Sequence, residues 1–126
     1  MVERIPEEIE WYLARFIALI QECQDERFRE SWYSTRVVTA EKGRVYWKIW
    51  VDDLDPGSMQ RRIFGFVRIK DGAIFMAADF KKPATKGKNA IRGYIWEEHP
   101  ENYFTWTGIV YDERCYLKGV PRLMFS

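Results

Sequence analysis

Histidine and cysteine are scarce in this chain of 126 residues, which has one histidine and two cysteines. Cys23 and Cys115 show no paired spacing, which excludes a zinc knuckle or a disulfide framework and favours a reduced, intracellular protein. His99 lies in a polar turn with Glu97 and Glu98, and adjacent residues rarely converge on one metal ion, so we interpret it as a surface histidine. No nucleophile and base can be paired around it. We therefore expect no metal, no cofactor and no catalytic residues, and we favour a protein that is not an enzyme.

Long apolar runs are absent as well. No segment approaches the roughly eighteen uncharged apolar residues of a membrane helix, and the N-terminal MVERIPEEIEW is charged from its third residue. We therefore expect no membrane span, no membrane partner and no secretion signal, and we predict a cytoplasmic location. A calcium loop is missing too, because Asp52, Asp53 and Asp55 have no downstream glutamate, and we interpret them as turn formers.

The composition is that of one globular domain, predicted to span residues 1–126. Apolar residues make up 47% and aromatic residues 17%, which is enough for a folded core without disulfide bonds. A helix is predicted from about Pro6 to Gln24, with proline and glutamates in its first turn. Its apolar stripe is Ile9, Leu13, Phe16, Ile17, Ile20 and Cys23. The opposite, polar side is predicted to carry Glu10, Gln21, Glu22 and Gln24.

Short runs of β-branched and aromatic residues predict strands after the helix. They are residues 32–39, 45–51, 62–70 and 73–77. Turns at residues 41–44 and 70–72 join them in pairs, the second through an Asp-Gly step that suits a tight hairpin, and residues 55–58 form a longer loop. The sequence therefore predicts an α+β fold, in which the N-terminal helix packs on an antiparallel meander of four or five strands.

Large aromatic residues alternate along the predicted strands, and their faces admit two interpretations. One face carries Val45, Trp47, Ile49 and Val51, the other carries Tyr46, Lys48 and Trp50, and Phe64 and Phe66 share a face of the next strand. Both faces can be buried, one under the helix and one partly under the C-terminal segment, or one face can be a platform on which bases stack. We favour burial, because a domain of this size needs most of its large side chains in its core.

Positive charge is concentrated in the middle of the chain, although the net charge is only +1. Residues 61–93 hold nine bases and two acids, whereas residues 1–30 hold eight acids and four bases. The densest cluster is Lys81, Lys82, Lys86, Lys88 and Arg92, with no acid between them. Such a cluster is typical of proteins that bind an anionic partner such as nucleic acid, although most lysine-rich loops are simply solvated.

This cluster does not form the phosphate-binding loop of nucleotide hydrolases. Gly87 and Lys88 are followed by Asn89 where serine or threonine is needed, and no glycine stands five residues before Gly87. The sequence therefore gives no support for nucleotide hydrolysis.

The central stretch carries a motif. It reads Phe64-Gly65-Phe66-Val67, Gly72-Ala73-Ile74, Ala77-Ala78-Asp79-Phe80-Lys81-Lys82-Pro83-Ala84 and Ala90-Ile91-Arg92-Gly93-Tyr94-Ile95. This stretch resembles the central part of a family of small uncharacterised bacteriophage and prophage proteins, with Phe80 at the position where that family usually has tryptophan. The resemblance implies a phage or prophage origin and, for such a protein, the host cytoplasm, with no assigned activity. It also implies that Pro83 and the Arg92-Gly93 pair belong to the motif.

Three functional hypotheses follow. The first is a binding module without enzymatic activity. In it, nucleic-acid phosphates contact Lys81, Lys82, Lys86, Lys88 and Arg92, and bases stack on Phe80, Tyr94 or Trp96. The alternative is an interaction or assembly protein that binds a host or virion protein, or a second copy of itself, through its acidic helix and basic loop. The third, an enzyme acting on nucleic acid, would need acids such as Glu97, Glu98 or Asp52 and Asp53 to meet Asp79.

Overall fold

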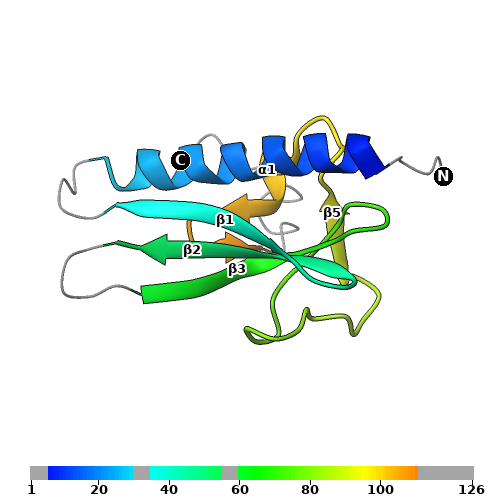
Figure 1. The fold of residues 1–126 in the computed structure, drawn as a ribbon. Coiled ribbons are helices and arrows are strands. Elements are labelled where there is room, and N and C mark those ends of the chain that lie inside the picture. Colours follow the sequence, from blue (N-terminus) through cyan, green and yellow to red (C-terminus); the bar gives the residue numbers. More distant parts are fainter. Residues whose placement is uncertain (1–5, 30–34, 55–59, 111–126) are drawn as a thin grey trace, which may run out of the picture.

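The computed structural model describes residues 6–29, 35–54 and 60–110. In these residues one long helix packs on a five-stranded sheet (Figure 1). The elements are α1 (Pro6–Arg27), β1 (Arg36–Lys42), β2 (Tyr46–Asp53), β3 (Gln60–Arg68), β4 (Ala73–Phe75) and β5 (Ile91–Tyr94). The sheet order is β1-β2-β3-β4-β5 and every neighbouring pair is antiparallel. The expected helix on an antiparallel meander is therefore confirmed.

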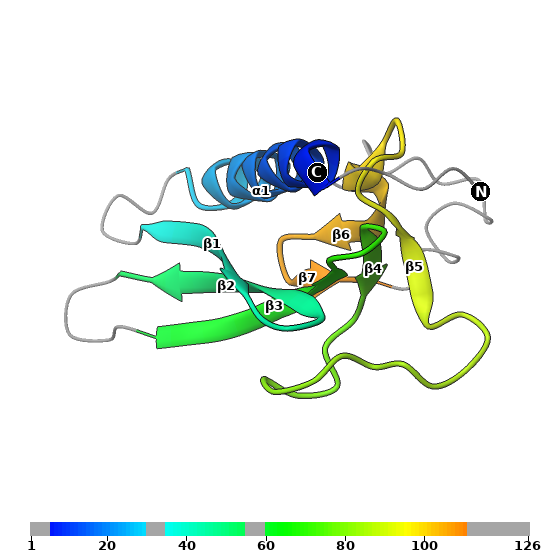
Figure 2. The same cartoon turned by 45° about the vertical axis from the view of Figure 1, so that its right-hand side comes forward.

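A small second hairpin follows the sheet, and the sequence did not predict it. A short 3-10 helix, η1 (Pro100–Tyr103), leads into strands β6 (Phe104–Thr105) and β7 (Gly108–Ile109), which pair with each other. Figure 2 shows this hairpin on the same side of the sheet as α1. A Cβ atom on Gly65 of β3 would lie 2.3 Å from Cγ1 of Ile109, so glycine at this position allows β7 to approach the sheet.

The space between α1 and the sheet holds the larger of two apolar clusters, which we call the main core. It contains Ile9, Leu13, Phe16, Ile20, Val38, Trp47, Ile49, Val51, Phe64, Val67, Ile74, Ile95, Phe104 and Ile109. The predicted helical stripe is confirmed, with Ile17 and Cys23 packed at its margin. The prediction for Gln24 was wrong: only 1% of this residue is exposed, and its side-chain amide donates to the carbonyl oxygen of Trp106 at 2.8 Å.

A β-bulge in β3 corrects the predicted faces of the sheet. Ile49 pairs with Gly65 and Trp50 pairs with Ile63, so Phe64 is the extra residue between two paired positions. A bulge changes the side of the sheet on which the following side chains lie. Phe64 consequently joins the main core, whereas Phe66 lies in the second cluster on the opposite face.

That second cluster, the minor core, consists of Phe66, Ala73 and Phe75, with Tyr46, Ile63, Ala77, Ala90 and Tyr94 packed around it. Ala77 and Ala90 belong to the connection between β4 and β5, so this connection covers part of the far face. The sequence predicted that the C-terminal segment would cover this face, but residues 111–126 lie outside the described residues. Burial of the large rings is confirmed, because Trp47, Trp50, Phe64 and Phe66 are at most 8% exposed.

Several boundaries differ from the predicted ones. The helix continues to Arg27. The described part of the first strand begins at Arg36, and Thr35 before it is not in a strand; residues 32–34 of the predicted strand lie outside the described residues. The predicted turn at residues 70–72 is confirmed, because Gly72 has a φ of 78°, a value that glycine adopts without strain. Val45, predicted to face the core, is 48% exposed in the turn between β1 and β2.

Two of the predicted turn formers prove to be strand residues. Asp52 and Asp53 end β2, where Asp52 pairs with Arg61 at 2.8 Å and Asp53 pairs with Arg36 at 3.2 Å. Both carboxylates thus neutralise arginines on the neighbouring strands. Asp55, the predicted loop at 55–58 and Cys115 lie outside the described residues. No helix within the described ranges is both long and apolar enough to cross a membrane.

Candidate nucleic-acid interface

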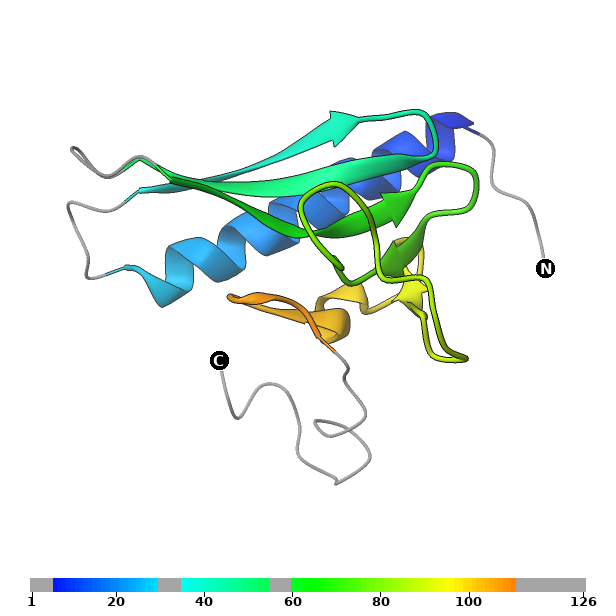
Figure 3. The same cartoon turned by 90° about the horizontal axis from the view of Figure 1, so that it is seen from below.

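The predicted basic cluster lies mainly on the connection between β4 and β5, residues 76–90, which we call the lysine loop. Figure 1 and Figure 3 show it on the side of the sheet away from α1. Its first half is a narrow turn closed by a bridge between Ala77 and Pro83, and the amide of Ala84 donates to the carbonyl oxygen of Met76 at 2.8 Å. The first half of the loop is therefore closed on itself by backbone contacts.

Asp79 shapes the tip of this turn. Its Oδ1 atom accepts hydrogen bonds from the backbone amides of Lys81 at 2.7 Å and Lys82 at 3.1 Å. The bond from the Lys81 amide is the main reason why the pKa of Asp79 lies below its ordinary value, and the bond from Lys82 acts in the same direction. Because its carboxylate holds the turn together, Asp79 has a structural explanation that requires no metal.

The four lysines of the loop stand in solvent. Lys81, Lys82, Lys86 and Lys88 are all exposed, and Phe80 at the tip is 56% exposed. The ammonium nitrogen of Lys81 lies 5.5 Å from the centre of the Phe80 ring. Within residues 6–29, 35–54 and 60–110, no carboxylate lies within ion-pair distance of these four lysines. Their charges are thus available to a partner.

A second turn carries the last two lysines. Gly87 has a φ of 95°, and the amide of Ala90 donates to its carbonyl oxygen at 3.3 Å. A Cβ atom on Gly87 would meet nothing within 4 Å, so glycine is used here for its backbone conformation and not for space. This turn presents Lys86 and Lys88 on either side of an open backbone.

Arg92 and Tyr94 lie on β5 and not in the loop. Both side chains are half-buried, and the Tyr94 ring stacks on Trp96 at a centroid distance of 4.9 Å while packing against the minor core. The indole nitrogen of Trp96 donates to the carbonyl oxygen of Asp71 at 2.8 Å. The structure therefore brings Phe80 and the four lysines into one loop, and places Arg92 and Tyr94 on the strand that follows it.

Three arginines on the sheet, Arg61, Arg62 and Arg68, already have hydrogen-bond partners. Arg68 donates to both carboxylate oxygens of Asp71, at 3.0 and 2.7 Å, and this hydrogen bonding raises the pKa of Arg68. Burial by itself raises the pKa of Asp71, but the hydrogen bonds from Arg68 and from the Ala73 amide bring it below its ordinary value. Much of the excess charge of residues 61–93 is therefore concentrated in the lysine loop.

Trp50 does not provide a stacking platform. Its indole nitrogen donates to Glu41 at 3.0 Å, and the guanidinium carbon of Arg61 lies 4.6 Å from its ring centre. Only 8% of the residue is exposed. Among the aromatic rings of residues 35–54 and 60–110 on the sheet face away from α1, Phe80 is the one whose exposure suits base stacking.

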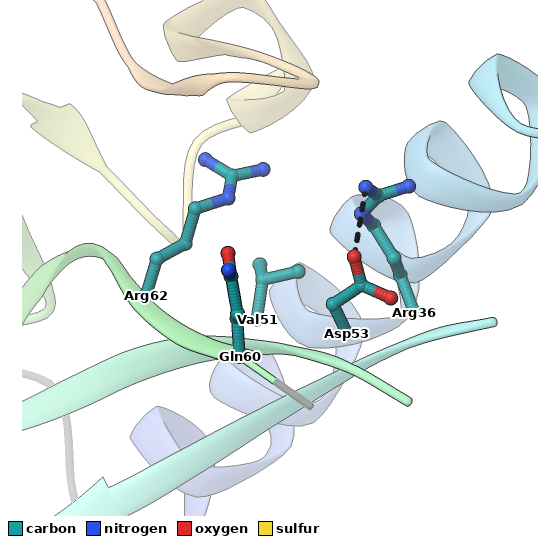
Figure 4. A pocket seen from close by; sticks show the side chains of 5 residues that line it. All are labelled: Arg36, Val51, Asp53, Gln60 and Arg62. Carbon is teal, nitrogen blue, oxygen red and sulfur yellow. Dashed lines mark hydrogen bonds and ion pairs between the residues drawn. The ribbon is translucent and has the colours of Figure 1, made fainter. Parts of the chain in front are cut away.

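A second polar site was not foreseen from the sequence. Arg36, Val51, Asp53, Gln60 and Arg62 line a small pocket (Figure 4). They belong to the start of β1, the end of β2 and the start of β3, at the end of the sheet away from the lysine loop (Figure 1). We call this site the arginine pocket. Its residues come from three strands, so only the register of the sheet reveals that they are neighbours.

No metal centre is found in the described part of the chain, where no three histidine, cysteine, aspartate or glutamate residues are close enough to share an ion. His99 is exposed, and its Nδ1 atom lies 2.9 Å from Oε2 of Glu101. Glu97 accepts hydrogen bonds from the Tyr94 amide at 2.9 Å and from the Tyr103 hydroxyl at 2.6 Å, so it has a structural role. Comparisons of this chain with protein-family models, curated proteins and solved structures found no match.

Proposed function

We propose that this protein is a binding module without enzymatic activity whose lysine loop contacts the phosphates of nucleic acid. The observation that supports it best is the set of four exposed lysines held on two fixed turns, with no carboxylate of the described residues paired to them. Lysine provides a hydrated point charge that suits phosphate oxygens without demanding one geometry. Binding of this kind depends on charge and is largely independent of sequence.

Phe80 gives the proposed interface a second type of contact. It stands at the tip of the first turn beside Lys81 and Lys82, more than half exposed. A base can stack on an exposed ring while the flanking ammonium groups hold the backbone, a combination that favours single strands. Arg92 and Tyr94 stay part of the proposal as residues at the base of the loop.

The proposal is tested by measuring the affinity for labelled single-stranded and duplex oligonucleotides as salt is raised. Each phosphate contact contributes about −0.7 to the slope of log K against log salt for a single strand. With the four lysines engaged we expect a slope of about −3 on single strands. The double variant Lys86→Ala/Lys88→Ala removes two of these contacts, so its slope should be less negative by about 1.4.

A matched control removes the same charge elsewhere. Arg27 and Arg29 are exposed at the end of α1 away from the lysine loop, and the double variant Arg27→Ala/Arg29→Ala should leave the slope unchanged. Absence of binding at low salt, or an equal loss of slope in both double variants, would show that the lysine loop is not the interface.

The alternative is an interaction or assembly protein, and it is supported by the separation of charge between two faces. The acids of α1 and the lysine loop lie on opposite sides of the sheet (Figure 1). The resemblance of residues 64–95 to phage proteins adds the proposal that any such partner is a host or virion protein. The two functions differ in their readouts, because only the first predicts a salt-dependent affinity for oligonucleotides.

A further inference from the structure

The arginine pocket is built by the register of three strands. Arg36 of β1 is paired with Asp53 of β2, which is paired with Gln60 of β3, so the three form a row across the sheet. In the adjacent row of the same face, Val51 is paired with Arg62. Figure 4 shows Arg62 on one side of the pocket and the Arg36–Asp53 pair on the other.

Both guanidinium groups are held in position by contacts within the domain. Arg62 donates to the carbonyl oxygens of Thr107 at 2.8 Å and Trp106 at 3.1 Å, in the turn between β6 and β7. These two bonds use two of the five N–H groups of a guanidinium, which leaves three for another acceptor. Arg36 donates to Asp53 at 3.2 Å, and its guanidinium carbon lies 3.5 Å from the centre of the Phe28 ring.

Positive charge exceeds negative charge among the described residues that line this pocket. They include two arginines, one carboxylate, that of Asp53, and the neutral amide of Gln60. Burial lowers the pKa of Arg62, the charge of Arg36 lowers it further, and Asp53 acts in the opposite direction. The direction of this pKa shift agrees with a site in which an added negative charge is favourable.

We propose that the arginine pocket binds a tetrahedral oxyanion, as inorganic phosphate or as the phosphate group of a small monoester. Its volume of about 80 Å³ exceeds the roughly 10–15 Å³ needed for one water, so a small oxyanion fits. Guanidinium groups bind phosphate through paired N–H bonds, and the Gln60 amide adds a donor. Among the described residues of the lining, Val51 is the one apolar side chain. The site is independent of the lysine loop, which lies at the other end of the sheet.

The experiment replaces chloride by phosphate at constant ionic strength and neutral pH, and follows the Nε–H signal of Arg62 by NMR. We expect a saturable shift in the intact protein. Gln60→Glu places a second carboxylate in the pocket without touching the bonds of Arg62, and should weaken phosphate binding at least about tenfold. Asp53→Asn removes the carboxylate that competes with phosphate for the arginines, and should strengthen phosphate binding.

A parallel titration with glycerol 3-phosphate distinguishes inorganic phosphate from a phosphate monoester as the ligand, because a site for a monoester binds glycerol 3-phosphate more tightly than inorganic phosphate.

Two controls separate this site from general charge effects. Arg44→Gln removes one exposed positive charge from the turn at the opposite end of β1 and β2, and should leave the affinity for phosphate unchanged. Lys86→Ala/Lys88→Ala should also leave it unchanged, so the outcome is independent of the proposed nucleic-acid binding. A shift that does not saturate, that chloride reproduces, or that Gln60→Glu leaves intact would overturn the inference.

Discussion

Arginine and lysine have different roles in this molecule. On the sheet, Arg61 bonds to Asp52, Arg68 bonds to Asp71, and Arg62 bonds to two carbonyl oxygens. The planar guanidinium, with several donors in one plane, suits such fixed pairing. The ammonium groups of the lysine loop are exposed, and their flexible stems suit a partner whose phosphates vary in position.

Phe80 provides a test of base stacking. If its ring stacks on a base, Phe80→Ala should weaken single-strand binding by about 1–3 kcal/mol while the salt slope stays the same, because no charge is removed. Phe80→Trp keeps an aromatic face and should bind at least as tightly. Fluorescence anisotropy at several salt concentrations measures both quantities. A Phe80→Ala variant that binds like the wild type would restrict the interface to phosphate contacts.

The Arg68–Asp71 pair predicts a dependence of stability on pH. In the folded protein the pKa of Asp71 lies below its ordinary value of 3.8, so its contribution is present above that value and is lost as pH falls through the folded pKa. Asp71→Asn should therefore lower the free energy of unfolding by about 1 kcal/mol at neutral pH, and the difference should shrink in acid.

Urea unfolding at neutral pH and below the ordinary pKa of aspartate measures this difference. Glu22→Gln is the control, because Glu22 is exposed on α1 and its substitution should change the stability by less than about 0.5 kcal/mol. A difference between Asp71→Asn and the wild type that is constant across this pH range would rule out the carboxylate as its source.

Two glycines of the sheet allow neighbouring elements to pack closely against it, because they carry no Cβ atom. Gly65 allows Ile109 of the small hairpin to approach β3, and Gly93 of β5 lies so close to Tyr103 that a Cβ atom would be 2.3 Å from its ring.

The edge of the sheet at β1 is capped by a side chain of α1. The Gln21 amide of α1 donates to the carbonyl oxygen of Arg36 at 2.7 Å and accepts from the amide of Val38 at 2.9 Å, as a neighbouring strand would.

The contact between Gly65 and Ile109 can be tested by a double-mutant cycle. Gly65→Ala places a methyl group against Ile109 and should destabilise the protein by about 1–3 kcal/mol. Ile109→Ala removes the atom that it meets, at a loss of about 2–5 kcal/mol by itself. The double variant should be more stable than the sum of the single effects predicts. Additive free energies of unfolding would mean that the two residues do not meet.

The helix and the longer strands were predictable from the sequence, because periodicity over seven or more residues is a strong signal. β5, β6 and β7 could not be located, since strands of two to four residues show no periodicity, and the equally short β4 was located through the Asp-Gly turn before it. The bulge at Phe64 was missed because it depends on the partner strand. The lysine loop could be identified because its lysines lie close together in the sequence. The five residues of the arginine pocket are spread between positions 36 and 62, and only strand pairing brings them together.

At the scale of the whole molecule, the acids of α1 and the lysine loop lie on opposite sides of the sheet. The acids of α1 whose exposure is described are all exposed, and they are Glu8, Glu10, Glu22, Asp25 and Glu26. They lie across the sheet from the lysine loop (Figure 3). Contacts between unlike faces of identical molecules are head-to-tail, and they produce open chains unless the rotation closes a ring.

This arrangement predicts the form of any self-association. At low salt the average mass by light scattering should rise with protein concentration without a plateau at a dimer, and it should return to that of a monomer at high salt, where attraction between exposed charges is screened. Lys86→Ala/Lys88→Ala should reduce the rise. A dimer of fixed mass that persists at high salt would point to an apolar interface instead.

The lysine loop is attached to the domain through two small residues, Ala77 and Ala90, which pack against the minor core, while residues 78–82 and 85–89 between them are exposed. Substitutions at these exposed positions leave both cores intact, and only Asp79 and Gly87 among them are needed for the two turns of the loop. The charge, length and tip residue of the loop can therefore diverge rapidly among descendants of this chain without loss of folding. In the laboratory, the same segment is a natural place to graft a foreign peptide or to exchange one binding specificity for another.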